Sequence, residues 1–359
     1  MTSRTFILDN GAHTIKAGYA GSEAPAVIPN CIARSKTRGV FVADEINSRL
    51  KDQSGVDFRR PIDKGHLVNW ESEKAIWDRV FFAEELGFRI PTDDTTLVLT
   101  EPVLSLPACS ANTDQIVFEE YGFGAYVRCP AATLASFGPA FGAPGECTLV
   151  IDMGYNAVNI VPVVDHAVVT AAVRRLNVGG KLLTNYLKET ISYRYYNMMD
   201  ETAIVAAIKE ACCYVTADYA ADLERWRAGG DVVAEYVLPT ATAGGFRPGH
   251  VRGPGERVGD DEQVLKLGNE RFAVPELLFA PSDAGLRQGG LHEGVAQALA
   301  AIDDETTRAL LAANIVVVGG TALLPGVRER LTRELRPLLP AEYTIRLGAV
   351  DRYVSLPPH

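Results

Sequence analysis

Three turns that lie far apart in the chain each follow a short apolar run of the kind that forms a strand. The turns are Asp9-Asn10-Gly11, Asp152-Met153-Gly154 and Gly319-Gly320-Thr321, and the runs before them are Phe6-Ile7-Leu8, Leu149-Val150-Ile151 and Ile315-Val316-Val317-Val318. Glycine in such a turn lets backbone amides approach a phosphate, because no Cβ stands in the way. A single Asp-x-Gly turn is also common in ordinary hairpins. The ordered set of three predicts two similar halves that close on one nucleotide.

Two of these turns begin with an aspartate at the end of the strand. Asp9 and Asp152 are therefore placed to face a cation that accompanies the phosphates. Mg²⁺ keeps much of its hydration shell, so a carboxylate usually reaches it through water. We expect Asp9 and Asp152 to orient Mg²⁺ in this way.

The composition is that of a globular protein with an acidic surface. Of the 359 residues, 47% are hydrophobic and 22% are charged, and the formal net charge is −10. A protein that binds nucleic acid with its whole surface is basic, so any contact with DNA is local or made through partners. The most apolar stretch, residues 157–173, is interrupted by Asn159, Asp165 and His166 and predicts two strands rather than a membrane span.

The start of the chain and the cysteines indicate an intracellular protein. Residues 1–4 run directly into the first predicted strand, which leaves no room for a signal peptide. The cysteines show no C-x-x-C pair and no metal-finger spacing. A reducing compartment is the expectation that follows.

Caps and apolar periodicity predict helices between the strands. Asn69 can cap one helix, with Glu71 and Glu73 in its first turn. Asp200 can cap a second helix, and a third follows Pro325-Gly326. Because strands alternate with helices, the predicted fold class is α/β.

The segment 240–259 differs from the rest because it is rich in glycine and has no apolar periodicity. Arg247, Arg252 and Arg257 lie between its glycines. A solvated surface loop is the favoured interpretation, and a local basic contact surface is the alternative.

The chain resembles actin and its relatives over essentially its whole length. Besides the three turns, the resemblance rests on these short sequences: Lys16-Ala17-Gly18-Tyr19-Ala20-Gly21, Ile208-Lys209-Glu210, Cys213-Tyr214-Val215, Asn269-Glu270-Arg271-Phe272 and Pro325-Gly326. Single turns are weak evidence, but the ordered set is specific.

The resemblance implies an actin-like (ribonuclease H-like) bilobal α/β fold, with two duplicated α/β domains flanking a nucleotide cleft. The implied subdomain 1 is residues 1–30, 66–142 and 343–359, and subdomain 2 is residues 31–65, too short for an extended filament-contacting loop. Subdomain 3 is residues 143–178 and 287–342, and subdomain 4 is residues 179–286, which include the insertion 240–259.

The resemblance also implies the ligand, which is ATP or ADP with Mg²⁺. Lys16 would neutralise phosphate charge, Lys209 and Glu210 would border the adenine, and Leu323 with Leu324 would cover the base or ribose. His13 could contact phosphate or face solvent. The implied nucleotide-binding residues are Asp9, Gly11, Ala12, His13, Lys16, Asp152, Gly154, Tyr155, Asn156, Gly180, Lys209, Glu210, Gly319, Gly320, Thr321, Leu323 and Leu324.

The groups with which actin positions its attacking water are replaced in this chain. The segment 126–137, expected to be helical, contains no glutamine, and Ala131 falls at or next to that position; Asn159 stands where actin has a histidine. Tyr155 replaces an aspartate of the second turn, and Ala12 removes a hydroxyl. We therefore expect binding without hydrolysis and assign no catalytic residue.

Further short sequences resemble a nuclear subfamily of the actin-related proteins. They are Leu67-Val68-Asn69-Trp70, Thr100-Glu101-Pro102, Phe118-Glu119-Glu120-Tyr121, Met199-Asp200-Glu201-Thr202 and residues 269–275. This resemblance implies a structural subunit of a Swr-type chromatin remodeller, which exchanges a histone variant into nucleosomes in the nucleus. The implied partners are the motor subunit and a zinc-finger (HIT-type) companion, with the nucleosome or its DNA reached indirectly or through the basic segment.

Three other functions remain open from the residues. The chain could be an ATP-hydrolysing, filament-forming actin relative, although the short segment 39–61 argues against filaments. It could be a small-molecule kinase of the same superfold, for which no carboxylate base is evident beyond Asp9 and Asp152. It could also be a scaffold with an empty cleft. The chain ends at Pro357-Pro358-His359, before the terminal helices usual in the family, and we expect it to be a fragment.

Overall fold

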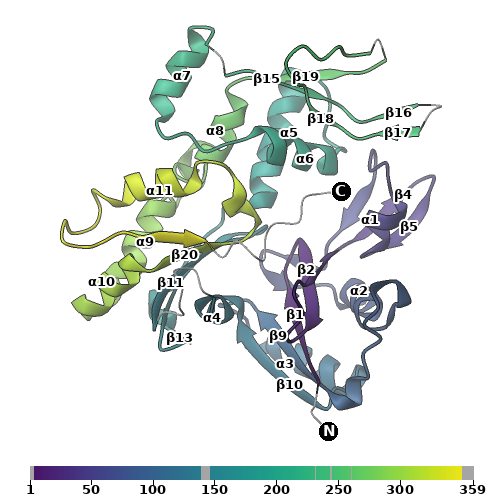
Figure 1. The fold of residues 1–359 in the computed structure, drawn as a ribbon, viewed down its shortest axis with the longest axis vertical. Coiled ribbons are helices and arrows are strands. Elements are labelled where there is room, and N and C mark those ends of the chain that lie inside the picture. Colours follow the sequence, from purple (N-terminus) through teal and green to yellow (C-terminus); the bar gives the residue numbers. More distant parts are fainter. Residues whose placement is uncertain (1–3, 139–145, 231, 243–244, 260, 350–359) are drawn as a thin grey trace.

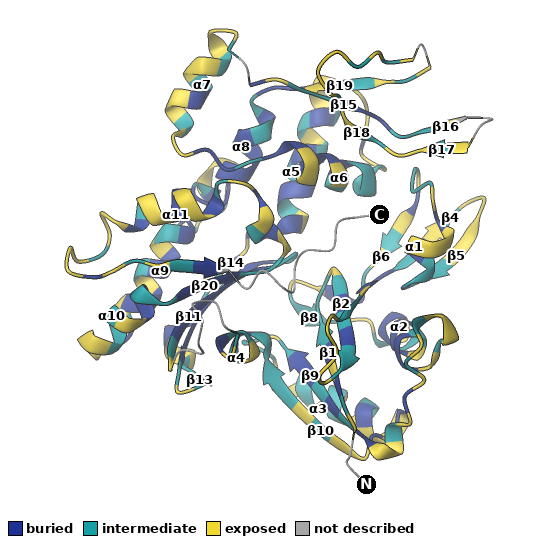
Figure 2. Ribbon diagram, in the orientation of Figure 1, coloured by how far each residue is buried: buried dark blue, intermediate teal, exposed yellow. Residues whose placement is uncertain are grey.

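The computed structural model has two lobes, each built around a β-sheet (Figure 1). It describes residues 4–138, 146–230, 232–242, 245–259 and 261–349. The actin-like α/β fold expected from the sequence is confirmed. Buried residues follow the two sheets and the helix faces turned toward them, and exposed residues cover the outer helices (Figure 2).

The sheet of the first lobe has the strand order β10-β9-β1-β2-β3. Its strands are β1 (Arg4–Asn10), β2 (Thr14–Tyr19), β3 (Ala26–Pro29), β9 (Thr95–Glu101) and β10 (Ala125–Pro130). β1 runs antiparallel to β2 and parallel to β9. This register sets Asp9 opposite Lys16, so the first turn leaves the sheet with both charged groups at one edge.

Helix α2 (Trp70–Phe82) covers this sheet and confirms the cap predicted at Asn69. The Asn69 side chain accepts a hydrogen bond from the backbone N–H of Ser72 at 2.9 Å. Trp77 and Phe81, four residues apart, are fully buried against Phe6 and Leu8. The apolar face of the helix therefore fixes its position on the sheet.

A small unit extends from the first lobe between β3 and α2. It contains β4 (Ile32–Ser35), β5 (Gly39–Val42), α1 (Glu45–Arg49), β6 (Asp57–Arg59), β7 (Ile62–Asp63) and β8 (His66–Leu67). Cys31, Ala33, Ile46, Leu50 and Val56 form its own hydrophobic core. β5 connects to β6 through one short helix.

The sheet of the second lobe repeats the hairpin of the first lobe. Its strands are β11 (Cys147–Met153), β12 (Val158–Val164), β13 (Ala167–Val168), β14 (Arg174–Leu176), β20 (Ile315–Val318) and β21 (Leu347–Ala349). β11 and β12 are antiparallel with Asp152 opposite Asn159, and β20 runs parallel to β11. The second and third turns therefore leave neighbouring strands at the same edge.

The predicted return of the chain to subdomain 1 at residue 343 is wrong. β21 pairs in parallel with β20, and Tyr343, Ile345 and Leu347 pack with the core of the second lobe. The remainder of that prediction, residues 350–359, and its boundary segment 139–145 lie outside the described residues. The β21 segment adds a strand to an existing parallel sheet, and chain order alone does not reveal such an edge pairing.

Helices pack on the second sheet and make up most of the rest of this lobe. They are α4 (Ala131–Ser136), α5 (Gly180–Arg194), α6 (Thr202–Cys212), α7 (Tyr219–Arg227), α8 (Glu270–Glu276), α9 (Leu291–Ala300), α10 (Glu305–Ala313) and α11 (Val327–Leu335). α3 (Pro107–Gln115) belongs to the first lobe. The shorter helices are η1 (Glu84–Leu86), η2 (Thr92–Asp94), η3 (Ile116–Glu120), η4 (Thr170–Ala172), η5 (Pro281–Ala284) and η6 (Gly320–Leu323).

Two predictions about helix starts need correction, and one is confirmed. α6 begins after Glu201 without a side-chain cap, so Asp200 does not cap it. The segment 126–137 is strand β10 up to Pro130 and helical only from Ala131. α11 begins after Gly326 as predicted. The backbone of Gly326 is left-handed (φ 86°), a conformation that glycine adopts readily.

The described residues of the segment 240–259 lie at the surface, as expected, but part of the segment forms strands and is not an irregular loop. It forms β16 (Thr240–Thr242), β17 (Gly245–Arg247) and β18 (His250–Val251), and β18 pairs with β15 (Ala234–Val237), which also pairs with β19 (Val264–Leu267). Arg247 forms an ion pair with Glu262 at 3.2 Å, and Arg252 forms one with Glu235. Neighbouring carboxylates thus neutralise two of the three arginines.

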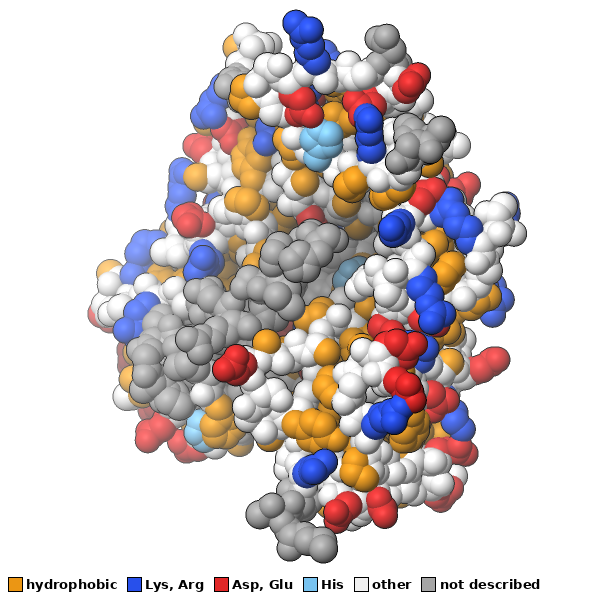
Figure 3. Space-filling view, turned by 45° about the vertical axis from the view of Figure 1, so that its right-hand side comes forward, with side chains coloured by type: hydrophobic (Ala, Val, Ile, Leu, Met, Phe, Trp, Pro, Cys, Tyr) orange, Lys and Arg blue, Asp and Glu red, His pale blue; other side chains and the backbone are white. Residues whose placement is uncertain are grey.

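The surface in view in Figure 3 mixes basic and acidic side chains. No helix among the described residues is both long and apolar enough to cross a membrane.

The buried ion pair between Arg330 and Glu276 gives a stability test. Arg330 on α11 donates to both carboxylate oxygens of Glu276, at 2.9 and 3.1 Å, and both side chains are about 90% buried. Removing one partner leaves a buried charge without compensation, so Arg330→Ala should lower the free energy of unfolding by about 3 kcal/mol. Its exposed neighbour Arg333, which contacts Asp218 at 3.7 Å, is the control; Arg333→Ala should cost less than about 1 kcal/mol. Urea denaturation measures both, and equal losses would contradict the assignment.

Candidate functional site

The first turn places a fixed ion pair at the edge of its sheet. Lys16 donates from Nζ to Asp9 Oδ2 at 3.0 Å, and the Thr100 hydroxyl donates to Asp9 Oδ1 at 2.7 Å. Burial alone lowers the pKa of Lys16, but the carboxylates of Asp9 and Asp152 act more strongly and raise it. Lys16 is therefore a permanent cation beside the turn.

A buried polar network holds the first turn in place. It was not predicted from the sequence. The Asn30 amide donates to the carbonyl of Gly11 at 3.0 Å and to Asn10 Oδ1 at 3.3 Å, and Asn10 in turn donates to Glu73. Asn30 and Glu73 are fully buried. The available signal was the position of Glu73, which lies four residues before Trp77 on the apolar face of α2, where a charged side chain is unusual.

The second turn brings its aspartate toward the first. The Asn159 side chain hydrogen bonds to Asp152, its cross-strand partner. Burial and the nearby charge of Asp9 raise the pKa of Asp152 to about 6, while Lys16 acts in the opposite direction. Asp9, Lys16 and Asp152 thus belong to one electrostatic cluster that joins the two lobes.

The third turn packs directly onto the second. Gly319 has φ 96°, and a Cβ there would lie 2.5 Å from the carbonyl oxygen of Met153 and 3.0 Å from Asp152 Oδ1. Thr321 donates from its hydroxyl to the carbonyl of Gly154 at 3.1 Å. Only glycine permits this approach, so the predicted convergence of Gly154, Gly319 and Thr321 is present in the fold. Gly320, the first residue of η6, would meet nothing within 4 Å if it carried a Cβ.

The start of α5 and the middle of α6 lie next to these turns and add Gly180 and Lys209 to the cluster. The backbone N–H of Gly180 donates to the carbonyl of Gly154 at 3.1 Å. Lys209 is buried and donates to the carbonyl of Gly180 at 3.3 Å and to Thr184 at 3.0 Å, and its burial lowers the pKa of its amine. Glu210, next on the same helix, is exposed.

The paired leucines separate in the structure. Leu323 is 59% exposed, whereas Leu324 packs in the core of the second lobe. Leu323 thus retains the free surface that a ligand contact requires, and a contact between Leu324 and the base or ribose remains a prediction.

His13 and Tyr155 meet between the two lobes. Ala12 and His13 form the tip of the first turn, and the His13 ring centroid lies 4.8 Å from that of Tyr155. Desolvation of the imidazole and the cations Arg60, Lys209 and Lys16 lower the pKa of His13 to about 3, although the residue as a whole keeps an exposed surface. His13 is therefore neutral at physiological pH.

These residues fit a nucleoside diphosphate or triphosphate. Lys16, Lys209 and Arg60 all act on His13 and supply positive charge around the turns. Within the described part of the chain, Asn156 Nδ2 is a buried donor without a partner, as a ligand-facing amide would be. The described residues contain no group of three or more metal-ligating side chains, so Mg²⁺ would depend on Asp9, Asp152, water and phosphate together.

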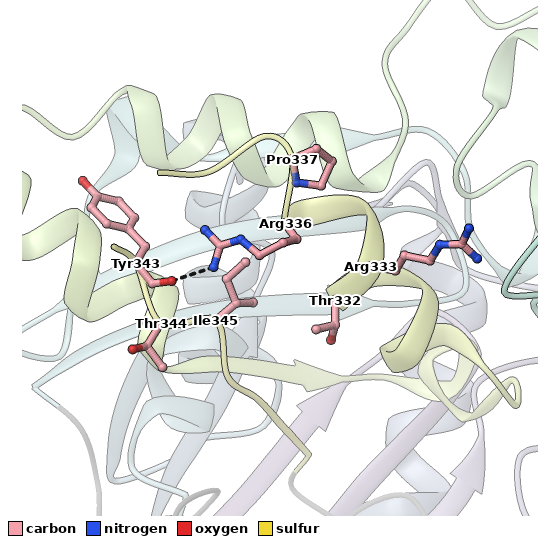
Figure 4. Close-up of a pocket in the computed structure, with 7 residues that line it drawn as sticks. All are labelled: Thr332, Arg333, Arg336, Pro337, Tyr343, Thr344 and Ile345. Carbon is pink, nitrogen blue, oxygen red and sulfur yellow. Dashed lines mark hydrogen bonds between the residues drawn. The ribbon is translucent and has the colours of Figure 1, made fainter. Parts of the chain in front are cut away.

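Two surface hollows lie away from this cluster. One of about 620 Å³ is lined by α11 and residues 343–345, where Arg336 donates to the carbonyl of Tyr343 at 2.8 Å (Figure 4). The other, of about 430 Å³, is lined by Glu235, Arg252, Arg257, Val258, Val264 and Lys266. Neither contains a predicted nucleotide-binding residue.

The adjacent glycines of the third turn make a matched pair for mutation. Gly319→Ala forces a Cβ against the Met153 carbonyl and a left-handed backbone, so we expect a loss of about 2–4 kcal/mol in unfolding free energy. Gly320→Ala adds its Cβ in open space and should change stability by less than about 1 kcal/mol. Denaturation without added nucleotide compares them, and a stable Gly319→Ala protein would refute the close approach.

Glu73 gives a pH test of the network below the first turn. Burial raises the pKa of Glu73 from 4.5 to about 7, against the opposing hydrogen bonds of Asn10, Trp77 and Asn30. The folded protein keeps this proton where the unfolded chain releases it, so the unfolding free energy falls as pH rises from 4.5 to 7.

Glu73→Gln should therefore be more stable than the native chain above pH 7, by up to about 3 kcal/mol, and the difference should vanish below pH 4.5. Exposed Glu71 on the same helix is the control, because Glu71→Gln removes a charge without touching the network. Chemical denaturation from pH 4 to 8 measures the effect. If the unfolding free energies of the native chain and of Glu73→Gln differ by the same amount at every pH, Glu73 is not protonated in the folded protein.

Comparison with known proteins agrees with the fold. The sequence model of the actin family, described as "Actin", matches residues 2–355. An "Actin-like protein ARP6" of Cryptococcus neoformans is 44% identical over an alignment that covers 96% of this chain and 75% of the relative. Another of the same name from Yarrowia lipolytica is 42% identical (96% and 86% covered), and "Actin-related protein 6" of Drosophila melanogaster is 39% identical (97% and 89% covered). Because the family model matches residues 2–355 and relatives that are 39–44% identical align over nearly all of this sequence, the chain belongs to the actin family.

Proposed function

We propose that the chain is a nucleotide-binding, non-hydrolysing structural subunit of a nuclear Swr-type remodelling complex, which exchanges a histone variant into nucleosomes. The convergence of the three turns around Asp9, Lys16 and Asp152 carries the nucleotide part of the proposal. The complex is inferred from similarity to relatives named actin-related protein 6.

Binding of ATP or ADP would stabilise the closed arrangement of the lobes. The turns supply glycine backbone and the cations Lys16 and Lys209, and Asp9 with Asp152 would orient Mg²⁺ through water. A ligand held only by the closed, folded protein stabilises it by about 4 kcal/mol at a thousandfold excess over its Kd. That amount is a large part of the stability of an ordinary domain.

Hydrolysis needs a group that positions or deprotonates water. The residues at the corresponding places of this chain are not suited to either task. Ala131 has only a methyl group, and Asn159 carries an amide that hydrogen bonds to Asp152 and cannot take up a proton. Loss of one such group typically lowers the rate about 10²–10⁴-fold. We therefore propose that the bound nucleotide is retained and not consumed.

The partners follow from the same inference. We propose the remodeller motor subunit and a zinc-finger (HIT-type) subunit as direct partners, and a nuclear location. Contact with nucleosomal DNA through the segment 240–259 would centre on Arg257, since Arg247 and Arg252 are in ion pairs. The short β5–α1–β6 connection offers no extended loop for filament contacts.

Analysis of the nucleotide content tests the binding proposal. Protein purified without added nucleotide, denatured and chromatographed should release about one ADP or ATP per chain, and phosphate release from added ATP should stay at background. Lys16→Ala should lose at least about tenfold in nucleotide affinity, because a phosphate-facing cation is removed. Protein without nucleotide and without affinity for it would favour the empty scaffold, and steady phosphate release would favour a hydrolysing actin relative.

Affinity purification of the tagged chain from nuclear extract tests the complex. The proposal requires a motor ATPase and a zinc-finger subunit in the eluate. Their absence, with filaments pelleted from the purified chain, would support the filament-forming alternative.

A further inference from the structure

A stack of three side chains crosses from one lobe to the other beside the phosphate turns. We call His13, Tyr155 and Arg60 the seam stack. His13 lies at the tip of the first turn, Tyr155 follows the second turn, and Arg60 directly follows β6 in the small unit of the first lobe. The His13 and Tyr155 ring centroids are 4.8 Å apart with an interplanar angle of 34°, and the guanidinium carbon of Arg60 lies 4.9 Å from the Tyr155 centroid.

Arg60 ties the stack to the backbone of the first turn. Its Nη1 donates to the carbonyl of His13 at 2.9 Å and to the carbonyl of Asn30 at 3.4 Å. The same guanidinium therefore fixes the first turn through hydrogen bonds and contacts the second lobe through the Tyr155 ring. A planar guanidinium suits both roles, whereas an ammonium group does not.

Within the seam stack, Arg60 carries the single positive charge. His13 is neutral, so it does not repel Arg60 and can pack on Tyr155 as an aromatic ring. Tyr155 occupies the place where the family resemblance gives an aspartate. This chain thus has an uncharged ring where a carboxylate would otherwise face the phosphates.

Among the described residues, three further contacts join the small unit of the first lobe to the second lobe, and all three are polar and open to solvent. Lys181 pairs with Asp63 at 2.9 Å, Arg175 donates to the carbonyl of Lys64 at 2.7 Å, and the backbone N–H of Gly55 donates to Glu201 at 3.1 Å. Exposed polar pairs contribute little to stability and are screened by salt. The contact next to the turns is of a different kind, since it joins two aromatic rings and a guanidinium group.

We propose that the seam stack holds the two phosphate turns together whether or not nucleotide is bound, and that it sets a slow release of the nucleoside phosphate. The slow release of the nucleoside phosphate rests on the proposed nucleotide binding, whereas the holding of the two turns does not. A ligand between the turns can leave only when the lobes part. Parting the lobes breaks the stack.

The first measurement is nucleotide release. A fluorescent N-methylanthraniloyl derivative of ADP, bound with Mg²⁺ and chased with excess ADP, reports the dissociation rate. Tyr155→Ala should release it about tenfold faster, because the ring contacts with His13 and Arg60 are lost together. Arg60→Lys keeps the charge but loses the planar stack, and it should also release faster. Tyr155→Phe keeps the ring and should restore slow release.

The second measurement does not need nucleotide. Small-angle X-ray scattering of the nucleotide-free protein should give a larger radius of gyration for Tyr155→Ala and Arg60→Lys than for Tyr155→Phe. The matched control is Tyr214, whose ring lies 5.2 Å from the guanidinium carbon of Arg271 within the second lobe. Tyr214→Ala loses a similar stack but should not open the lobes. Thermal unfolding of each variant checks that it is folded.

Two results separate the inference from the proposed function. If no variant and not even the native chain binds the fluorescent nucleotide, nucleotide binding fails, and scattering alone decides whether the stack closes the lobes. If Tyr155→Ala matches the native chain in radius of gyration and in any measurable release rate, the seam stack has no closing role and the inference is overturned.

Discussion

The close packing of three backbone turns around Asp9, Lys16 and Asp152 is the constraint on which the rest of the structure depends. Each lobe needs its own sheet to present a turn, and the second lobe needs two neighbouring parallel strands to present two. The carboxylates repel one another, and the charge of Lys16 offsets that repulsion. Lys16 and a pair of acidic groups therefore come together only because two sheets meet there.

The duplicated hairpins show how one backbone plan supports different chemistry. β1–β2 sets Lys16 opposite Asp9, whereas β11–β12 sets Asn159 opposite Asp152 at the equivalent cross-strand position. The first pairing yields a permanent cation. The second yields an amide that hydrogen bonds but cannot act as a base. In our proposal this difference separates binding from hydrolysis, and Tyr155 adds an aromatic contact where the family would hold a charge.

Several parts of the site followed from the sequence because they depend on local rules. The apolar runs predicted β1, β11 and β20, and glycine chemistry predicted the turns after them. The start of α2 was also predicted, because Asn69 has a residue type that caps helices. The polar network at the first turn did not follow from the sequence, because Asn30 and Glu73 meet Asn10 only after β3 joins the first sheet and α2 packs on it. The same reason hid Arg60, whose partners His13 and Tyr155 lie in different lobes.

The sequence by itself determined β1, β11 and β20, the glycine turns after them and the resemblance to the actin family, since strand periodicity and glycine conformations are properties of neighbouring residues. Only the tertiary structure decided that β21 extends the second sheet, that the glycine-rich segment pairs as strands, and that Arg247 and Arg252 are neutralised by acidic neighbours. These outcomes depend on which surfaces meet when distant segments fold together. Burial and charge pairing are set by that meeting and not by the order of residues along the chain.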